Sequence, residues 1–111
     1  MSMASGTVAP AANVDTAAAI AVERRTPVAR LSELGVTSWP KWGGPRGRYA
    51  LRYGARQTCY IVRGKVIATV EGSPESSIQF GAGDLVVVAR GTRCTWHILA
   101  AVDMHYAFDP S

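Results

Sequence analysis

From residue 47 to residue 108 the chain repeats one pattern, a short apolar segment followed by a turn that usually contains glycine. In the first segment every second residue is apolar, a period typical of a half-buried strand, and these positions are Tyr49, Leu51 and Tyr53. Further apolar segments follow at residues 58–62, 65–70, 77–80, 84–89, 94–99 and 102–108. We therefore expect seven or eight short strands and almost no helix, which indicates an all-β sandwich or barrel.

The first third of the chain is less regular. Residues 1–19 are rich in alanine and small polar residues, and we expect a disordered tail there. Residues 20–24 fit a short strand, residues 28–36 fit one or two helical turns closed by Gly35, and residues 38–47 fit a turn-rich loop. The predicted organisation is a tail over residues 1–19 and one folded domain over residues 20–111.

The composition is that of an ordinary globular protein, with 48% hydrophobic and 18% charged residues. No apolar run approaches the roughly 18 residues that a membrane-spanning helix needs, so we expect no membrane interaction. Two cysteines without a secretory hydrophobic segment fit free thiols in a reducing compartment. We expect a cytoplasmic protein, and the alternative is a plastid location if residues 1–19 belong to a targeting segment.

Four segments carry a resemblance to a known family: SWPKWG (residues 38–43), QTCYIVRGKV (57–66), GDLVVVARGTRCTW (83–96) and VDMHY (102–106). Together they resemble the short single-domain cupins of plants and bacteria that are grouped with ureidoglycine aminohydrolase and the ethanolamine-utilisation proteins. The resemblance spans roughly residues 20–109. It implies the cupin fold, a double-stranded β-helix or jelly-roll barrel, with one short helical turn at most near the N-terminus.

The metal-binding cupins, which this chain resembles, share a ligand set of three histidines and one glutamate around a divalent ion. The resemblance places the glutamate position at Gln57 and the last histidine position at Cys94. The other two positions fall either on residues 50 and 52 or on Leu51 and Tyr53, and the alternation favours the second pair because it faces inwards. Such a set is a poor metal centre, so we expect no metal ligands and no cofactor, with a divalent metal as the alternative.

Close relatives of this short type, as the resemblance implies, carry a glutamate at the position of Gln57 and a lysine at the position of Met104. Loss of both can remove a buried ion pair as a unit, which costs less than loss of one partner alone. We interpret the chain as a catalytically reduced member of the group.

Cys94 and His105 are the candidate catalytic residues if a reaction takes place. A thiol nucleophile needs a base within hydrogen-bond reach. His97 points away from Cys94 on the same predicted strand, whereas His105, on the next predicted strand, could face it across the barrel. The alternative is that Cys94 and Cys59 are small apolar residues that line the interior.

Two functions remain. The first is a metal-free barrel that binds a small polar or anionic metabolite, with a pocket lined by Leu51, Tyr53, Gln57, Cys59, Cys94, Trp96 and His105. The second is an aminohydrolase- or isomerase-like enzyme that uses a divalent metal or Cys94. The sequence favours the first, because the ligands that the second needs are missing.

The positive charge is concentrated in one stretch: residues 41–65 contain seven basic residues and no acidic residue. A nucleic-acid surface combines such charge with exposed rings for stacking. Because Tyr49 and Tyr53 are expected inside, the arginines lack that platform and we expect no nucleic-acid partner. We expect a homodimer, formed through a sheet edge or by exchange of the strand at residues 20–24.

Overall fold

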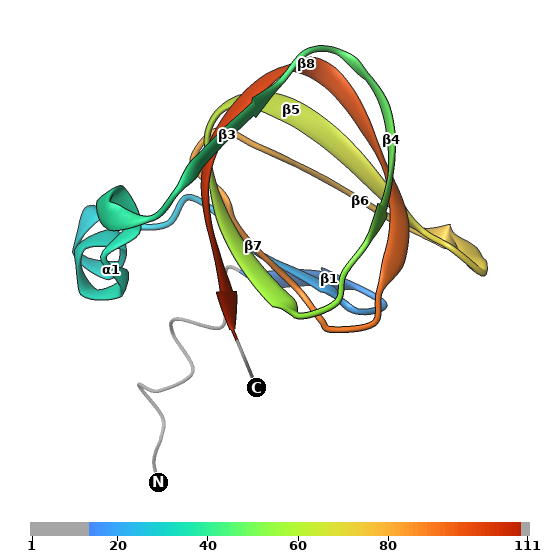
Figure 1. The fold of residues 1–111 in the computed structure, drawn as a ribbon, viewed down its shortest axis with the longest axis horizontal. Helices are drawn as coiled ribbons and strands as arrows, with labels where there is room; N and C mark the ends of the chain where they lie inside the picture. The colour runs from blue at the N-terminus through green and yellow to red at the C-terminus, as the bar shows by residue number, and fades with distance from the viewer. Residues whose placement is uncertain (1–13, 110–111) are drawn as a thin grey trace, which may run out of the picture.

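The computed structural model describes residues 14–109, which form one α-helix, a short 3-10 turn and eight strands. The strands are β1 (Val14–Ala17), β2 (Ile20–Glu23), β3 (Lys41–Gly44), β4 (Gly47–Arg52), β5 (Arg56–Val70), β6 (Ser73–Gly81), β7 (Leu85–Val88) and β8 (Arg93–Asp109). They pair antiparallel in one sheet that curls into a barrel (Figure 1). The all-β jelly-roll barrel predicted from the sequence is confirmed.

The two longest strands, β5 and β8, run through both layers of the barrel. The first half of β5 and the second half of β8 lie in the order β1-β2-β7-β5-β8-β3. Their other halves pair with each other and with β6 and β4. Each long strand therefore contributes inward-facing side chains to both walls of the interior.

Gly64 allows β5 to change layer without ending. Its φ is +115°, and a Cβ atom there would lie 2.6 Å from the carbonyl oxygen of Ala101. The pairing register of β5 with β8 shifts around this residue. The sequence pattern predicts separate strands at residues 58–62 and 65–70, and again at residues 94–99 and 102–108. Both divisions are wrong, because each long strand bends while its ladder continues.

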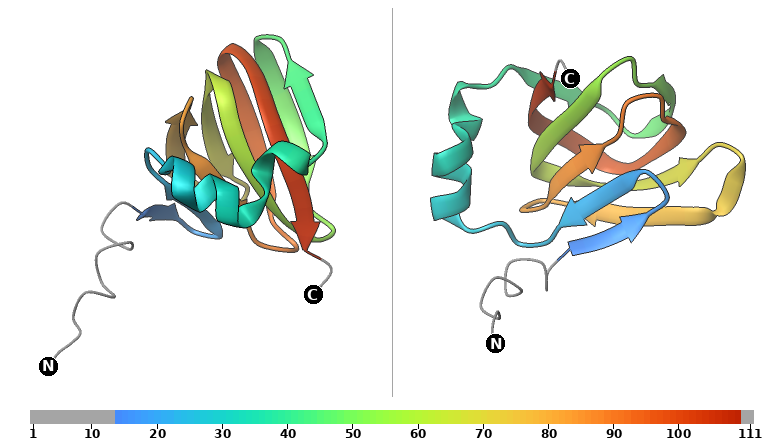
Figure 2. Two further views of the ribbon diagram at one scale, coloured as in Figure 1. Left: turned by 90° about the vertical axis from the view of Figure 1, so that its left-hand side faces the viewer. Right: turned by 90° about the horizontal axis from the view of Figure 1, so that it is seen from below.

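The N-terminal part differs from the expectation in two places. Helix α1 (Val28–Leu34) ends at Gly35 with φ +68°, which confirms the short helix, and it lies beside the barrel (Figure 2). However, β1 (Val14–Ala17) pairs with β2, so the expected tail over residues 1–19 is corrected for residues 14–17. Residues 1–13 lie outside the described residues. Likewise, β3 forms within the predicted loop at residues 38–47. Backbone pairing to β2 and β8 stabilises these segments, whose side chains carry no strand pattern.

The core fills the space between the two layers of the barrel. Phe80 and Trp96 meet edge to face there, with ring centroids 5.4 Å apart. The rings are surrounded by fully buried aliphatic side chains from β2, β5, β7 and β8, among them Val22, Ile61 and Val88. Within residues 14–109 no helix is both long and apolar enough to cross a membrane.

Candidate functional site

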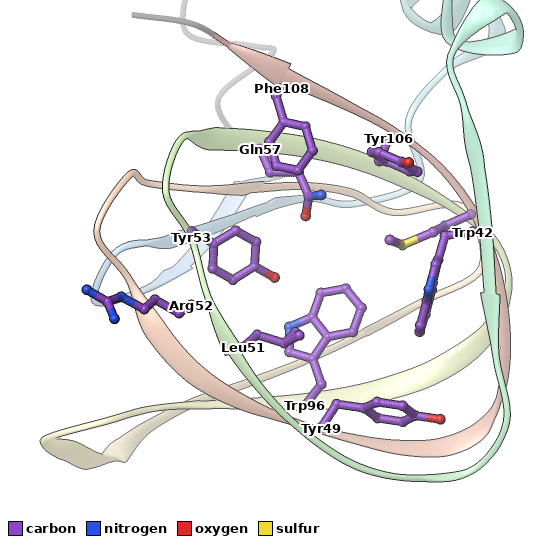
Figure 3. Close-up of a pocket in the computed structure, with 10 residues that line it drawn as sticks. Trp42, Tyr49, Leu51, Arg52, Tyr53, Gln57, Trp96, Tyr106 and Phe108 are labelled. Atoms are coloured by element: carbon purple, nitrogen blue, oxygen red, sulfur yellow. The ribbon is translucent and has the colours of Figure 1, made fainter.

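A cavity of about 300 Å³ opens into the barrel between β3, β4, β5 and β8. Its wall is mostly aromatic, with few polar groups. The lining residues are Trp42, Tyr49, Leu51, Arg52, Tyr53, Gln57, Trp96, Met104, Tyr106 and Phe108 (Figure 3). A volume of this size suits a small organic molecule.

Strand pairing brings this lining together from distant parts of the sequence. The inward alternation of β4 is confirmed, and the register places Tyr49 directly opposite Trp96 of β8. Along β8 every second side chain points to the same face of the sheet. Met104, Tyr106 and Phe108 therefore continue the wall that Trp96 begins.

The rim of the cavity is apolar and partly exposed. Trp42 is 37% exposed and Phe108 is 56% exposed, although both are large hydrophobic side chains. Trp42 meets Tyr49 edge to face at a centroid distance of 6.0 Å, and Phe108 meets Tyr106 in the same way at 5.8 Å. Two aromatic pairs from separate strands thus frame the opening, which leaves apolar surface for an occupant to cover.

Two polar groups point into the cavity: the hydroxyl of Tyr53 and the amide of Gln57 (Figure 3). Trp96 is 2% exposed, and its Nε1–H has no hydrogen-bond partner among the described residues. A buried donor left in this state costs about 1–3 kcal/mol. The Nε1 atom lies beneath the cavity wall, on the side where the indole approaches the Cys94 thiol.

The interior favours uncharged groups. Burial raises the pKa of the Tyr53 phenol above its ordinary value, and the nearby Cys94 and Cys59 add to the rise, so the hydroxyl stays protonated. Arg52 is the charged residue in the lining, and its guanidinium points away from the cavity (Figure 3). The polar groups that reach an occupant are therefore neutral donors and acceptors.

The four positions where the resemblance places metal ligands do not fit a metal ion. The register favoured by the alternation is confirmed, because Leu51 and Tyr53 line the cavity. Leu51 offers no donor atom, and Gln57 offers a neutral amide. Burial raises the pKa of the Cys94 thiol to about 11, so a metal ion would have to displace its proton in order to bind. Among the described residues, no group of three or more His, Cys, Asp or Glu side chains could hold a metal.

The two cysteines are free thiols, and neither lines the aromatic cavity. Cys59 is completely buried, which raises the pKa of its thiol to about 12. Cys94 lies on the wall of a second hollow, with Arg52 and Arg93 at its edge. The Trp96 indole, whose N–H approaches the thiol, offsets part of the rise in the Cys94 pKa. Both thiols therefore resemble buried structural cysteines rather than activated nucleophiles.

His105 does not meet Cys94. The two residues stand on the one continuous strand β8, an odd number of positions apart, so their side chains point to opposite faces of the sheet. The Nδ1 atom of His105 lies 3.4 Å from the carbonyl oxygen of Trp39, and the ring borders a hollow with Lys41 and Asp103. The prediction that His105 faces Cys94 across the barrel is wrong, because residues 94–99 and 102–108 belong to one strand.

The residues predicted from the sequence therefore account for part of the cavity lining. Four of the predicted pocket residues line the cavity, namely Leu51, Tyr53, Gln57 and Trp96, while Cys59, Cys94 and His105 do not. It missed the residues contributed by β3 and the end of β8, which are Trp42, Met104, Tyr106 and Phe108, and it also missed Tyr49 and Arg52 as lining residues. The period-two pattern of residues 102–108 could have indicated Met104, Tyr106 and Phe108. Each lies an even number of positions from Trp96 and therefore faces the same side of the strand.

The basic segment lies on the outer side of the barrel. Arg48 and Arg52 are exposed and alternate with the inward side chains of β4, as expected. Arg52 lies directly opposite Arg93 in the β4–β8 pairing, and Arg48 lies opposite His97. Tyr49 and Tyr53 point to the cavity on the other face, so the arginine face has no tyrosine ring from β4.

Comparison with known proteins identifies the family. Residues 31–106 match the family model described as the EutQ-like cupin domain. A DUF861 family protein from Thermotoga maritima is 33% identical, with a TM-score of 0.77, over 81% of this chain and 99% of that chain. No curated protein sequence matches the chain.

More distant structures share the fold alone. The Clostridium difficile EutQ protein is 11% identical with a TM-score of 0.52, over 60% of this chain and 46% of that chain. A DUF861 family protein from Pseudomonas syringae is 24% identical with a TM-score of 0.54, over 62% of this chain and 29% of that chain. The family match spans most of the barrel, and the Thermotoga protein matches over nearly its whole length, so the chain belongs to the EutQ-like cupin family.

Proposed function

We propose that this cupin binds a small molecule in its aromatic cavity without a metal ion. The observation that carries the proposal is a cavity of about 300 Å³ with a mostly aromatic wall, at whose rim Trp42 is 37% exposed and Phe108 is 56% exposed. Ligand sites of this kind combine an apolar wall with a few polar groups that orient the ligand. Tyr53 and Gln57 supply such groups.

The chemistry of the lining supports binding that does not depend on a metal. At the family's ligand positions stand a leucine, a protonated phenol, a neutral amide and a protonated thiol. The amide and the phenol favour hydrogen bonds to an organic molecule over coordination of a divalent cation.

The alternative, an aminohydrolase- or isomerase-like enzyme, has less support. A thiol mechanism needs a thiolate and a base, whereas burial raises the Cys94 pKa to about 11 and His105 lies on the other face of β8. A metal mechanism would need donors that the cavity lacks among the described residues. The observations therefore favour binding.

The proposal is tested by blocking the cavity with one side chain. Leu51→Phe enlarges a half-buried residue that lines the cavity, whereas Ala50→Phe adds a ring at the neighbouring exposed position on the outer face of β4. Thermal unfolding of the wild-type protein and both variants is measured with benzamide, benzoate, phenol and indole at about 10 mM each.

We expect at least one of these compounds to raise the melting temperature of the wild-type protein and of Ala50→Phe equally. The same compound should have little effect on Leu51→Phe, because the enlarged side chain occupies the ligand's volume. If every compound shifts the three proteins alike, or shifts none, the cavity is not a binding site and the proposal is rejected.

A further inference from the structure

We propose that the free edge of β4 binds an extended acidic segment of a partner protein by strand addition. The proposal does not depend on a ligand in the aromatic cavity. Three observations lead to it: β4 has a free edge, its outward face carries two arginines, and these arginines form no ion pair among the described residues.

β4 (Gly47–Arg52) is the edge strand of one layer of the barrel. It pairs with β8 alone among the described strands (Figure 1). No backbone hydrogen bond joins residues 47–52 to any other described segment. An edge strand directs every second backbone N–H and C=O away from its sheet, and these groups can pair with an added strand. β4 therefore offers a template of six residues for a partner strand.

The outward face beside this edge is basic. Arg48 and Arg52 are exposed, and Arg93 of β8 lies directly opposite Arg52. Like charges in directly opposite positions destabilise a sheet. The strand pairing therefore holds two arginines side by side at a cost in free energy, which an anionic group beside them would offset.

These three arginines differ from several others in the chain. Those that form ion pairs with an aspartate or glutamate are Arg24, Arg30, Arg56 and Arg63. Among the described residues, Arg48, Arg52 and Arg93 form none. Glu71 borders the same hollow as Arg52 and Arg93, yet it pairs with neither. The positive charge of this face therefore remains available to a partner.

The spacing of the arginines fits an extended segment. Arg48 and Arg52 lie four residues apart on one face of β4, which is about 13 Å at the rise of a strand. Two acidic residues four positions apart in an added strand have the same spacing and share one face. The residue midway between them would meet the small side chain of Ala50. Arginine and carboxylate groups form strong hydrogen-bonded pairs, so such a segment matches this face in both charge and spacing.

A second copy of the chain fits this edge poorly. If two copies paired antiparallel with their outer faces on one side, a centre at Ala50 would place Arg48 of one chain opposite Arg52 of the other. Nucleic acid is also less suited, because the arginine face has no tyrosine ring from β4 on which a base could stack. An acidic peptide supplies both the carboxylates and the backbone groups that this edge can bind.

The test uses fluorescein-labelled peptides with blocked ends, titrated to about 1 mM and followed by fluorescence anisotropy. The matching peptide is Thr-Glu-Val-Thr-Val-Glu-Thr, whose glutamates lie four positions apart and share one face. The control peptide, Thr-Glu-Val-Thr-Glu-Val-Thr, has the same composition, but its glutamates face opposite sides. A third peptide, Thr-Lys-Val-Thr-Val-Lys-Thr, carries lysines at the two acidic positions.

We expect the matching peptide to bind about fivefold more tightly than the control peptide, and the lysine peptide not to bind. The double variant Arg48→Glu, Arg52→Glu should bind the matching peptide about tenfold more weakly and should bind the lysine peptide instead. The double variant Arg56→Glu, Arg63→Glu is the matched control, because it makes the same change of charge at two exposed arginines of β5. It should leave the affinity for the matching peptide unchanged.

Strand addition also predicts protection of the free edge. In ¹⁵N-labelled protein, the backbone amides of residues 47–52 that exchange rapidly with solvent should exchange about tenfold more slowly when the matching peptide is bound. Such protection distinguishes a paired strand from a peptide held by its carboxylates alone.

Four results would overturn the proposal. They are no binding of the matching peptide, equal affinity for the two glutamate peptides, binding without protection of the β4 amides, and failure of the charge-reversed variant to accept the lysine peptide. A single-stranded oligothymidylate that binds more tightly than the matching peptide would also overturn it, and would assign this face to nucleic acid.

Discussion

Leu51 of β4 and Cys94 of β8 lie directly opposite each other. The family resemblance assigns both positions to histidine ligands of the metal-binding cupins. An alkyl group therefore faces a thiol whose pKa is raised by burial to about 11. These two positions therefore carry an alkyl group and a protonated thiol inside a cupin barrel. The interior instead presents aromatic rings and neutral polar groups.

The purified protein should contain no stoichiometric metal after incubation with manganese, iron, zinc or nickel. The reason is that Leu51, Tyr53, Gln57 and Cys94 provide no ionised donor at neutral pH. Elemental analysis of the wild-type protein and of Cys94→Ala measures this directly. One metal ion per chain in the wild-type protein, lost in Cys94→Ala, would contradict the metal-free proposal and favour the enzymatic alternative.

Both thiols should react slowly in the folded protein. With pKa values of about 11 for Cys94 and about 12 for Cys59, the thiolate fraction at pH 8 is about 100-fold or more below that of an unperturbed cysteine. We expect alkylation by iodoacetamide to be slower than in urea by at least this factor, with Cys94 reacting before Cys59, as mass spectrometry can follow. A native Cys94 that reacts as fast as the unfolded chain would point to an activated nucleophile.

Alkaline pH should destabilise the protein because of the same thiols. Each has a pKa that is raised in the folded state, so its contribution to stability is complete below about pH 8.5 and is lost as the pH rises towards the folded value. For Cys94 the loss amounts to about 2–3 kcal/mol by pH 11. Urea unfolding from pH 7 to pH 11 under reducing conditions measures it, and the decline should be shallower in Cys94→Ala. An equal slope in both proteins would mean that Cys94 does not titrate as described.

Gly44→Ala should disturb the mouth of the cavity. A Cβ atom at Gly44 would collide with the indole ring of Trp42, two residues earlier on the same face of β3, so the ring must move. We expect whichever of benzamide, benzoate, phenol and indole binds the wild-type cavity to bind several-fold more weakly, and the Trp42 indole N–H resonance to shift. Gly43→Ala is the matched control, since its Cβ would contact Asp103 at 3.1 Å and the carbonyl oxygen of Val102 at 3.4 Å instead of Trp42. Equal effects of the two substitutions would show that Trp42 has no special part in binding.

Much of the barrel could be predicted because its signals are local. The alternation of Tyr49, Leu51 and Tyr53 depends only on the period of a strand, and it assigned the inward face correctly. Gly35 closes a short helix with a positive φ that glycine adopts at little cost, again a property of the residue itself. Strand parity also predicts the inward position of Trp96, whereas Gln57 is predicted from the family resemblance, and both residues line the cavity.

The failures share one physical cause. Residues 93–109 form a single strand, and its length is decided by backbone pairing with β3, β4 and β5 rather than by its own side chains. Because that continuity fixes the parity of every residue, it turns His105 away from Cys94 and adds Tyr106 and Phe108 to the cavity. If the strand is broken at residues 100–101, as the sequence pattern predicts, the faces of residues 102–108 no longer follow from those of residues 94–99.

The sequence by itself determined the fold class and the inward face of β4, because each depends on residue type and short-range spacing. Only the tertiary structure decided which residues share the cavity. Trp42, Gln57 and Trp96 come from three strands far apart in the chain, and long-range pairing sets where they meet. The same packing buries the Trp96 N–H without a partner among the described residues. No local pattern could show that, since an unmet hydrogen bond is a property of the surroundings.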